Sequence, residues 1–259
     1  GKRHDPRLHP QLQERNHQGI HLFNQGRSGI VAKLLTTAYF PPISYFAAIA
    51  EDMEGLVRTK GEDRRSIPSS PLSPSTIYIE ACENYQKQSY RNRCHFYAAD
   101  GKQSLSFPIA HSEGTHKHLI SEVLIDYSKP WALQHKRAII SAYGTSAYFE
   151  YYQDELFAIL DSKPERLLDL NTRLLEFFLD KIGIKAEIRM TENYSQNTDC
   201  EDLREVIHPK RPDNILEKLE LNKPYFQVFA EKHGFIPNLS IMDLLFNEGP
   251  DSIIYLKKL

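Results

Sequence analysis

The segment VAKLLTTAYFPPISYFAAIAEDM, residues 31–53, contains the features that decide the fold class. Its first ten residues are apolar and rich in β-formers, which predicts a strand. The strand ends at Pro41-Pro42, because proline lacks the backbone N–H that a neighbouring strand would need. The small and aromatic residues after the prolines predict a helix. A strand, a tight turn and a helix in this order are the opening unit of an α/β protein.

The rest of the chain supplies further strands and three long helices. Strands are predicted for TIYIEAC at 76–82, EVLIDYS at 122–128, KAEIRM at 185–190 and SIIYL at 252–256. HFYAADGKQSLSFPI at 95–109 predicts a hairpin that turns at Asp100-Gly101. Helical spacing of apolar residues predicts helices over 130–144, 147–162 and 164–183, and Asn238 is placed to cap a short helix near the C-terminus. The predicted fold class is α/β, with a mixed sheet, an N-terminal strand-turn-helix unit, a β-hairpin and a helical middle.

Two segments differ in composition from this body. Residues 1–30 are rich in His, Arg, Gln and Pro and have little periodic hydrophobicity, which predicts an N-terminal extension or arm. Residues 58–75, RTKGEDRRSIPSSPLSPS, are charged and then rich in Ser and Pro, which predicts an exposed inserted loop. We therefore expect a single α/β domain over 31–259, whose C-terminal part packs beside the N-terminal turn.

Composition and charge narrow the function classes. A formal net charge of -2 over 259 residues produces no overall field that would draw the protein to nucleic acid. No apolar run approaches the roughly 18 residues of a membrane span. The three cysteines, Cys82, Cys94 and Cys200, form no C-x-x-C pair, which is typical of a reducing compartment. These features predict a soluble, cytoplasmic protein with no nucleic-acid partner and no membrane span.

The segment YQKQSYRNR, residues 85–93, is the strongest candidate for a binding site. It carries three positive charges and no acidic residue, and its tyrosines can stack on a sugar or base. Arginine forks match phosphate oxygens in a bidentate arrangement, so the predicted ligand is a nucleotide-sugar or another phosphorylated small molecule. In the alternative interpretation, the cations are solvated or paired with Glu80 and Glu83. The ligand-binding candidates in this segment are Tyr85, Lys87, Tyr90, Arg91, Asn92 and Arg93.

Tyr39 and Tyr45 are the second set of ligand-binding candidates. They flank the turn before the predicted helix, and a helix N-terminus offers backbone N–H groups to an anion. Pro41 and Pro42 remove donors from that turn. Packing of the two rings in the core is therefore the alternative.

Two histidines and one aspartate are the catalytic candidates. His208 and His233 lie among charged residues, and a neutral imidazole oriented by a carboxylate can act as a general base. Glu205, Glu231 and Asp243 are the carboxylates that could orient them. Asp243 could instead cap or pair within the fold, and a structural role for both histidines is the alternative.

The sequence contains no motif for a metal or a cofactor. His111, His116 and His118 are close enough in sequence for a metal site, but their polar, glycine-containing setting is typical of a surface loop. The chain lacks a G-x-S-x-G elbow, a P-loop, an H-E-x-x-H pair and a G-x-G-x-x-G loop. We therefore predict no metal and no cofactor.

Three blocks in this order resemble the WbqC-like protein family of bacteria. They are TAYFPPISYFAAIA at 37–50, ENYQKQSYRNRC at 83–94 and FIPNLSIMDLLFNEGP at 235–250. The loop at 58–75 and the segment before the C-terminal block depart from the family pattern. The resemblance implies an association with surface-glycan or O-antigen biosynthesis, and it transfers no catalytic residue.

Two functions from different classes are compatible with these features. The first is an intracellular transferase of surface-polysaccharide biosynthesis. Arg91 and Arg93 would hold its anionic ligand beside a stacked tyrosine, and His208 or His233 would move a proton. The second is a non-catalytic binding or scaffold protein of a glycan-assembly complex, which would expose an apolar patch and need no polar pocket. A homo-oligomer is compatible with either function.

Overall fold

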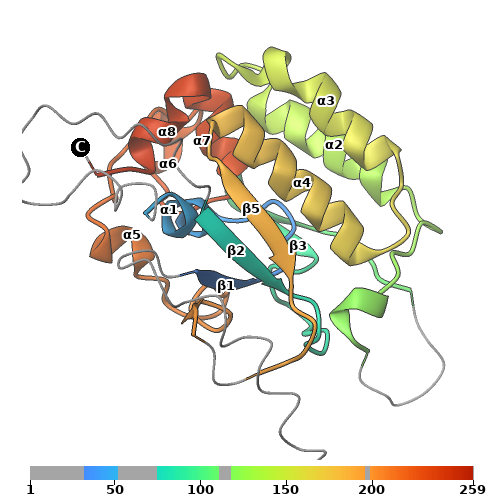
Figure 1. Ribbon diagram of the computed structural model, residues 1–259. Coiled ribbons are helices and arrows are strands. Elements are labelled where there is room, and N and C mark those ends of the chain that lie inside the picture. Colours follow the sequence, from blue (N-terminus) through green and yellow to red (C-terminus); the bar gives the residue numbers. More distant parts are fainter. Residues whose placement is uncertain (1–31, 52–74, 111–117, 196–198, 259) are drawn as a thin grey trace, which may run out of the picture. The chain divides into compact units, whose positions relative to one another are not determined.

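The parallel sheet is built around β1 (Lys33–Thr36), the strand that the opening segment predicts. All four of its residues are buried, as expected for a strand that is covered on both faces. β2 (Ser75–Glu80) and β6 (Glu201–Asp202) pair with the two sides of β1, and β5 (Ala186–Met190) pairs with β2. The strand order is β5-β2-β1-β6, and every pair is parallel (Figure 1). The computed structural model describes residues 32–51, 75–110, 118–195 and 199–258.

A separate two-stranded hairpin follows β2 in the chain. β3 (Arg93–Ala98) and β4 (Gly101–Ser106) are antiparallel, with Ala98 opposite Gly101. Gly101 has φ +93°, a conformation that residues with a side chain rarely adopt. The predicted hairpin is therefore confirmed. The α/β class is also confirmed, and the expected parallel and antiparallel strands are divided between two sheets.

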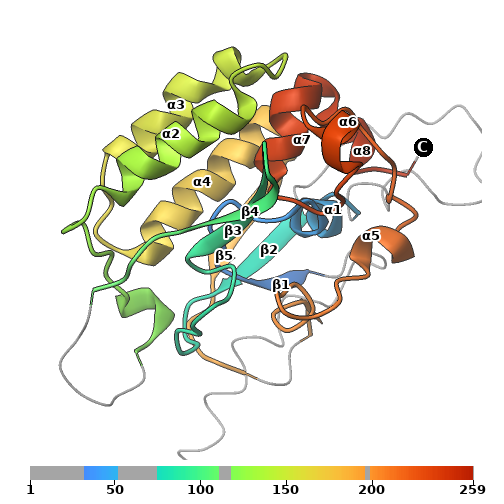
Figure 2. The same cartoon turned by 180° about the vertical axis from the view of Figure 1, so that it is seen from behind.

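Three long helices form the helical middle, as predicted. α2 (Trp131–Tyr143) packs on α3 (Phe149–Asp161), and α3 packs on α4 (Leu167–Ile182), so the three lie side by side (Figures 1 and 2). Buried side chains recur at helical spacing along α4, at Leu170, Leu174 and Phe178. The shorter elements are α1 (Ile43–Glu51), η1 (Ile120–Glu122), α5 (Ile215–Lys218), α6 (Ala230–His233), α7 (Ile241–Glu248), η2 (Gly249–Asp251) and α8 (Ser252–Tyr255).

The C-terminal block packs beside the N-terminal turn, as expected. The backbone N–H of Ile43 donates to the carbonyl of Leu239, and the N–H of Ile241 donates to the carbonyl of Pro41, each at 2.9 Å. The turn before α1 therefore obtains its hydrogen bonds from a segment almost 200 positions away.

Asn238 contributes to this junction in a way that the sequence did not predict. Its side-chain Oδ1 accepts from the backbone N–H of Ser44 at 2.9 Å, so Asn238 satisfies a donor in the first turn of α1. The N-cap of α7 is Ser240, whose side chain accepts from the N–H of Met242. The prediction that Asn238 caps its own helix is therefore wrong, because the residue two positions later takes that role.

Two predicted strands are not formed. Residues 252–256 continue from η2 into α8, and Ser252 Oγ donates to the Gly249 carbonyl at 2.6 Å within this helical turn. Residues 122–128 form only isolated bridges among the described residues, such as Ile125 with Ile109. Both segments have strand-like composition, but composition does not supply the partner strand that a ladder needs.

The predicted arm at 1–30 and all but the last residue of the predicted loop at 58–75 lie outside the described residues. The described residues belong to one compact unit, residues 31–259. None of the helices in this part of the chain combines the length and the apolar character of a membrane span.

Candidate functional site

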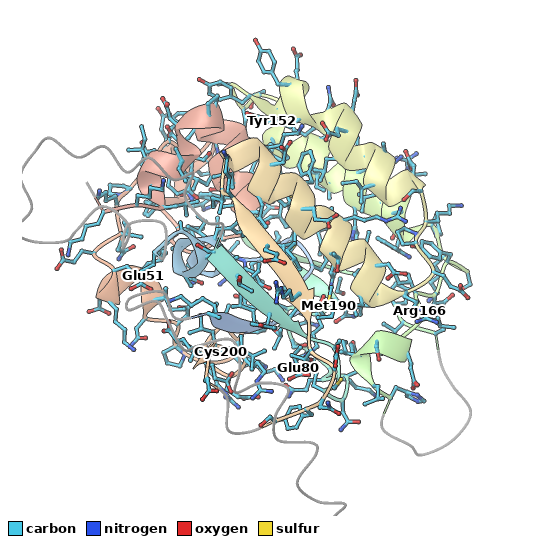
Figure 3. All side chains as sticks on the ribbon, viewed as in Figure 1. Glu51, Glu80, Tyr152, Arg166, Met190 and Cys200 are labelled. Carbon is cyan, nitrogen blue, oxygen red and sulfur yellow. The ribbon has the colours of Figure 1, made fainter. Side chains whose placement is uncertain are left out.

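The candidate site lies at the carboxyl edge of the parallel sheet. In the strand order β5-β2-β1-β6, β2 lies on one side of β1 and β6 lies on the other. The strands that follow β1 in the chain are therefore added first on one side of it and later on the opposite side. In open α/β sheets, such a change of direction leaves a crevice beyond the carboxyl ends of the strands, and ligands bind there. Figure 3 shows Glu80 and Met190 at the ends of β2 and β5 on this edge.

One buried ion pair links the strands at this edge. Glu80 is fully buried, and Arg204 Nη1 donates to its Oε2 at 2.6 Å. The same guanidinium donates to Asp202 Oδ2 at 2.6 Å and to the Ser195 carbonyl at 2.7 Å. The other carboxylate oxygen of Glu80 accepts from Thr191 Oγ1 at 2.7 Å. The pair therefore joins β2, β6 and the chain that follows β5.

A second buried ion pair holds the basic segment. Arg91 is 2% exposed, and it donates from Nε to Glu83 Oε1 at 2.8 Å and from Nη2 to Oε2 at 2.5 Å. Burial raises the pKa of Glu83, and the hydrogen-bonded guanidinium of Arg91 offsets part of that rise. This contact is the one that the alternative interpretation predicts. Arg91 Nη1 makes no hydrogen bond among the described residues, so the pair does not use the whole guanidinium.

His208 reaches the same edge from a distant part of the sequence. Lys210, two residues later, is hydrogen-bonded through Nζ to Gln88 Oε1, so the segment around His208 contacts the basic segment. Partial burial lowers the pKa of His208, and the cations Arg211 and Arg91 lower it further. Arg91 and His208 are therefore within electrostatic reach of each other, and the imidazole is neutral at neutral pH.

The proton of His208 lies on one defined nitrogen. His208 Nδ1 accepts from the backbone N–H of Lys210 at 3.2 Å. A neutral imidazole that accepts at Nδ1 carries its proton on Nε2. In this tautomer Nε2 donates a hydrogen bond, so His208 is suited to bind an anionic oxygen.

The structure brings some candidates of the basic segment together. Tyr85 is half-buried, and its pKa is raised by burial and lowered by the nearby cations Arg91 and Arg93. Lys87 is exposed. Tyr85, Arg91 and Arg93 are therefore close enough to interact electrostatically. His208 interacts electrostatically with Arg91 as well.

Four other predicted ligand-binding residues have partners within the fold: Tyr39, Tyr45, Tyr90 and Asn92. The hydroxyl of Tyr39 lies 2.8 Å from His135 Nδ1, and that of Tyr45 donates to the Thr36 carbonyl at 2.9 Å. Both rings are buried in the core, as Tyr90 is, and the side chain of Asn92 donates to a backbone carbonyl. The positions of Tyr39 and Tyr45 agree with the alternative that their rings pack in the core.

His233 lies beside the turn of the hairpin. Its Nε2 is 2.8 Å from the Ala99 carbonyl, and its ring centroid is 6.2 Å from that of Tyr97. Arg91 precedes the opposite end of β3. The structure therefore places the two catalytic histidine candidates in different surroundings.

Asp243 lies in a buried polar cluster on α7. Its Oδ2 accepts from the Tyr225 hydroxyl at 2.5 Å and from Gln227 Nε2 at 2.8 Å, and its Oδ1 accepts no hydrogen bond from the described residues. Burial raises the pKa of this carboxyl to about 6, although Tyr225, Gln227 and Tyr143 each lower it. The sequence contains no periodic signal for Tyr225 or Gln227, because both precede α6 in an irregular segment. The cluster matches the expectation that Asp243 pairs within the fold.

The buried carboxyl of Asp243 makes stability depend on pH. Its pKa of about 6 exceeds the ordinary 3.8, so the folded state binds this proton more tightly than the unfolded state does. Ionisation therefore costs stability as pH rises from about 4 through about 6, and the full cost is about 3 kcal/mol at neutral pH. Asp243→Asn removes the charge and keeps an acceptor oxygen. We expect its stability relative to the wild type to rise by about 2 kcal/mol between pH 4.5 and 7.5.

Urea unfolding of both proteins across this pH range measures the difference. Asp154→Asn, which removes an exposed carboxylate on α3, controls for the loss of one negative charge. A stability difference for Asp243→Asn that stays constant with pH would contradict the prediction.

The histidines considered for a metal site cannot be compared as a group. His111 and His116 lie outside the described residues. The backbone carbonyl of His118 accepts from the N–H of Tyr85 at 2.8 Å. Across residues 32–51, 75–110, 118–195 and 199–258, no three His, Cys, Asp or Glu side chains are grouped so that they could hold a metal ion.

The fold and its edge define an α/β protein with a small parallel sheet whose carboxyl side carries two buried ion pairs and a neutral histidine. The model of the WbqC-like protein family matches residues 74–212, more than half of the chain, so the chain belongs to this family. It is 27% identical over 195 residues to the uncharacterized protein Rv1507c of Mycobacterium tuberculosis. The matched region covers 67% of this chain and 84% of that protein. No solved structure matches the chain significantly. The family that the three sequence blocks resemble is thus confirmed.

Proposed function

We propose that the carboxyl edge of the sheet binds a phosphate-bearing donor of the nucleotide-sugar class, and that the protein is an intracellular transferase of surface-polysaccharide biosynthesis. The observation that carries the proposal is the hydrogen bond from Lys210 Nζ to Gln88 Oε1. It brings the segment around His208 to the basic segment that contains Arg91, where an open α/β sheet binds ligands. Lys210 and Arg211 add positive charge beside them.

The chemistry of these groups fits a phosphate. Glu83 holds the guanidinium of Arg91 in place, and Arg91 Nη1 is not used by that pair. His208 supplies a second donor at Nε2. Donors fixed before the ligand arrives lose little entropy on binding and need no reorganisation during the reaction.

The same donors also suit a transfer reaction. When a glycosyl group leaves a nucleotide-sugar, the bond between the sugar carbon and the phosphate oxygen breaks, and the electron pair stays on that oxygen. Hydrogen bonds from Arg91 and His208 would stabilise this developing charge. The half-buried ring of Tyr85 lies beside the guanidiniums and offers a surface for a sugar or base. Cys82 and Cys94 form no disulfide within the described part of the chain, which supports a reducing compartment such as the cytoplasm.

Ligand binding by a His208→Ala variant tests the proposal. We expect UDP-N-acetylglucosamine or another nucleotide-sugar, at a hundredfold excess over its Kd, to stabilise the wild type by about 2.7 kcal/mol in thermal unfolding. The variant loses one hydrogen bond to a charged group, so we expect its Kd to be about tenfold higher by calorimetry. His208 is partly exposed, so the variant is expected to fold.

Lys129→Ala is the matched control, because it removes an exposed cation just before α2 and leaves the sheet edge unchanged. If the wild type and His208→Ala bind the nucleotide-sugar with equal affinity, the ligand does not bind at the carboxyl edge of the sheet. If no nucleotide-sugar stabilises a protein that unfolds cooperatively, the transferase proposal fails and the non-catalytic scaffold replaces it.

A further inference from the structure

The outer face of the α2–α3 pair exposes apolar side chains from both helices. Leu133 and Ile140 lie seven positions apart on α2, so they share one face, and they are 45% and 47% exposed. On α3, Tyr151 is 79% exposed, and the exposed Ala158 lies seven positions later. Because α2 and α3 lie side by side (Figures 1 and 2), the two apolar stripes are neighbours. A shared apolar surface of this kind is typical of an interaction site.

The two helices carry opposite charges. The cations of α2 are Lys136 and Arg137, and this helix contains no acidic residue. α3 contains no cation, and its acidic residues are Glu150, Asp154, Glu155 and Asp161. Part of this charge is neutralised inside the chain, because Lys136 pairs with Asp161 and Glu155 pairs with Lys181 of α4.

Arg137 and Asp154 are the charges that remain on the two apolar stripes. Arg137 lies between Leu133 and Ile140 on the exposed face of α2, and Asp154 lies three positions after Tyr151 on the exposed face of α3. Neither Arg137 nor Asp154 makes a side-chain hydrogen bond or an ion pair among the described residues. Each stripe therefore combines exposed apolar side chains with one unpaired charge, and the two charges are opposite.

A second copy of the chain supplies the matching surface. In a two-fold dimer the same patch is used on both copies, so every contact occurs twice. When the two-fold axis runs along the helices between α2 and α3, α2 of each copy faces α3 of the other. The basic stripe with Arg137 then lies on the acidic stripe with Asp154, and apolar side chains meet in both contacts. A partner of uniform charge would attract one helix and repel the other.

We propose that the outer face of α2 and α3 is a self-association surface, on which a second copy docks with α2 against α3. Each helix has 13 residues and is therefore about 20 Å long. Two helices of this length form an interface at the small end of specific complexes, so the expected Kd is micromolar. Unfolding measured well below this concentration reports on the single chain. The surface contains no residue of the sheet edge and does not depend on the function proposed for it.

Sedimentation velocity over a range of protein concentrations tests this surface. We expect a monomer–dimer equilibrium of the wild type that weakens as the salt concentration rises, because exposed charges are screened. Arg137→Glu and Asp154→Arg each place like charges in both symmetric contacts, so we expect each to raise the Kd for dimerisation about tenfold or more. Tyr151→Ala removes the largest exposed ring of the surface, and we expect a similar increase. The three side chains are exposed, so the variants are expected to fold.

A mixture of the two charge variants provides the sharpest test. In each variant alone, both symmetric contacts bring like charges together. In a mixed dimer of Arg137→Glu with Asp154→Arg, both contacts pair opposite charges. We therefore expect the mixture to dimerise with a Kd close to that of the wild type. Lys218→Glu is the matched control, because it reverses an exposed cation on α5 and is expected to leave the Kd unchanged.

Three results would overturn the proposal. The first is a wild type that stays monomeric at millimolar concentration. The second is a dimer whose Kd is unchanged in both charge variants, since the copies would then associate through another surface. The third is a mixture that associates no better than either variant alone, although both variants are folded by circular dichroism. That result would exclude the arrangement of α2 against α3.

Discussion

Arg204→Met is expected to lower the free energy of unfolding by about 3–5 kcal/mol, because removing one partner of a buried ion pair leaves the other charge without compensation. Glu80 is fully buried, and Arg204 Nη1 is its cationic partner at 2.6 Å. The substitution also removes the contact with the Ser195 carbonyl. Urea unfolding at pH 7 measures the loss.

A double variant distinguishes the cost of the unpaired Glu80 carboxylate from the cost of losing the other contacts of the Arg204 side chain. Glu80→Gln with Arg204→Met removes both charges and keeps an acceptor oxygen for Thr191 Oγ1, so we expect it to recover most of the lost stability. Arg189→Met is the matched control on β5, where the arginine pairs with Glu187 and both side chains are more than 40% exposed. We expect that change to cost less than about 1 kcal/mol. A double variant as unstable as Arg204→Met would show that the unpaired carboxylate is not the cause.

Among the glycines that the structure describes, Gly249 is the one at which we expect a change to alanine to be most damaging. Gly249 has φ +55° and ψ -128°, a combination that residues with a side chain rarely adopt. A Cβ at this position would lie 2.5 Å from atoms of the Tyr148 ring, which is far inside van der Waals contact. Backbone strain and overpacking each cost about 1–3 kcal/mol, so we expect a combined loss of roughly 3 kcal/mol or more in urea unfolding.

Two further variants divide this loss into its causes. Gly183, at the end of α4, also has a positive φ of +81°, but a Cβ there would meet nothing within 4 Å. Gly183→Ala therefore measures the cost of a left-handed backbone at ψ 27° without steric overlap, about 1–2 kcal/mol. Adding Tyr148→Ala to Gly249→Ala should remove the steric overlap and recover part of the loss relative to Tyr148→Ala. If Gly249→Ala costs no more than Gly183→Ala, contact with Tyr148 does not explain the need for glycine.

The elements that the sequence predicted correctly are those whose patterns are local. The hairpin is specified by Asp100-Gly101 between two strand-like runs, and the end of α4 by Gly183 after an apolar face of helical period. The strand prediction for residues 252–256 was wrong because it, too, relied on a local pattern. Their composition favours a strand, but a strand also needs a partner, and the chain leaves η2 in a helical turn that continues into α8.

The candidate site was only partly predictable. Tyr85, Arg91, Arg93 and His208 were selected by residue type, and the structure places them in one neighbourhood. Arg204 was not selected, because it lies in a polar segment without periodic hydrophobicity.

The amino-acid sequence by itself determined the α/β class, the hairpin, the long helices and the family, because turn chemistry and hydrophobic period act over a few residues. Tertiary structure alone determined which charges are neutralised. Arg91 and Arg93 are nearly adjacent and chemically identical, yet Glu83 pairs with Arg91 while Arg93 has no such partner among the described residues. The electrostatic interaction energy of a charged group depends on its distance to other charges and on its burial. Both are set by contacts between segments far apart in the chain.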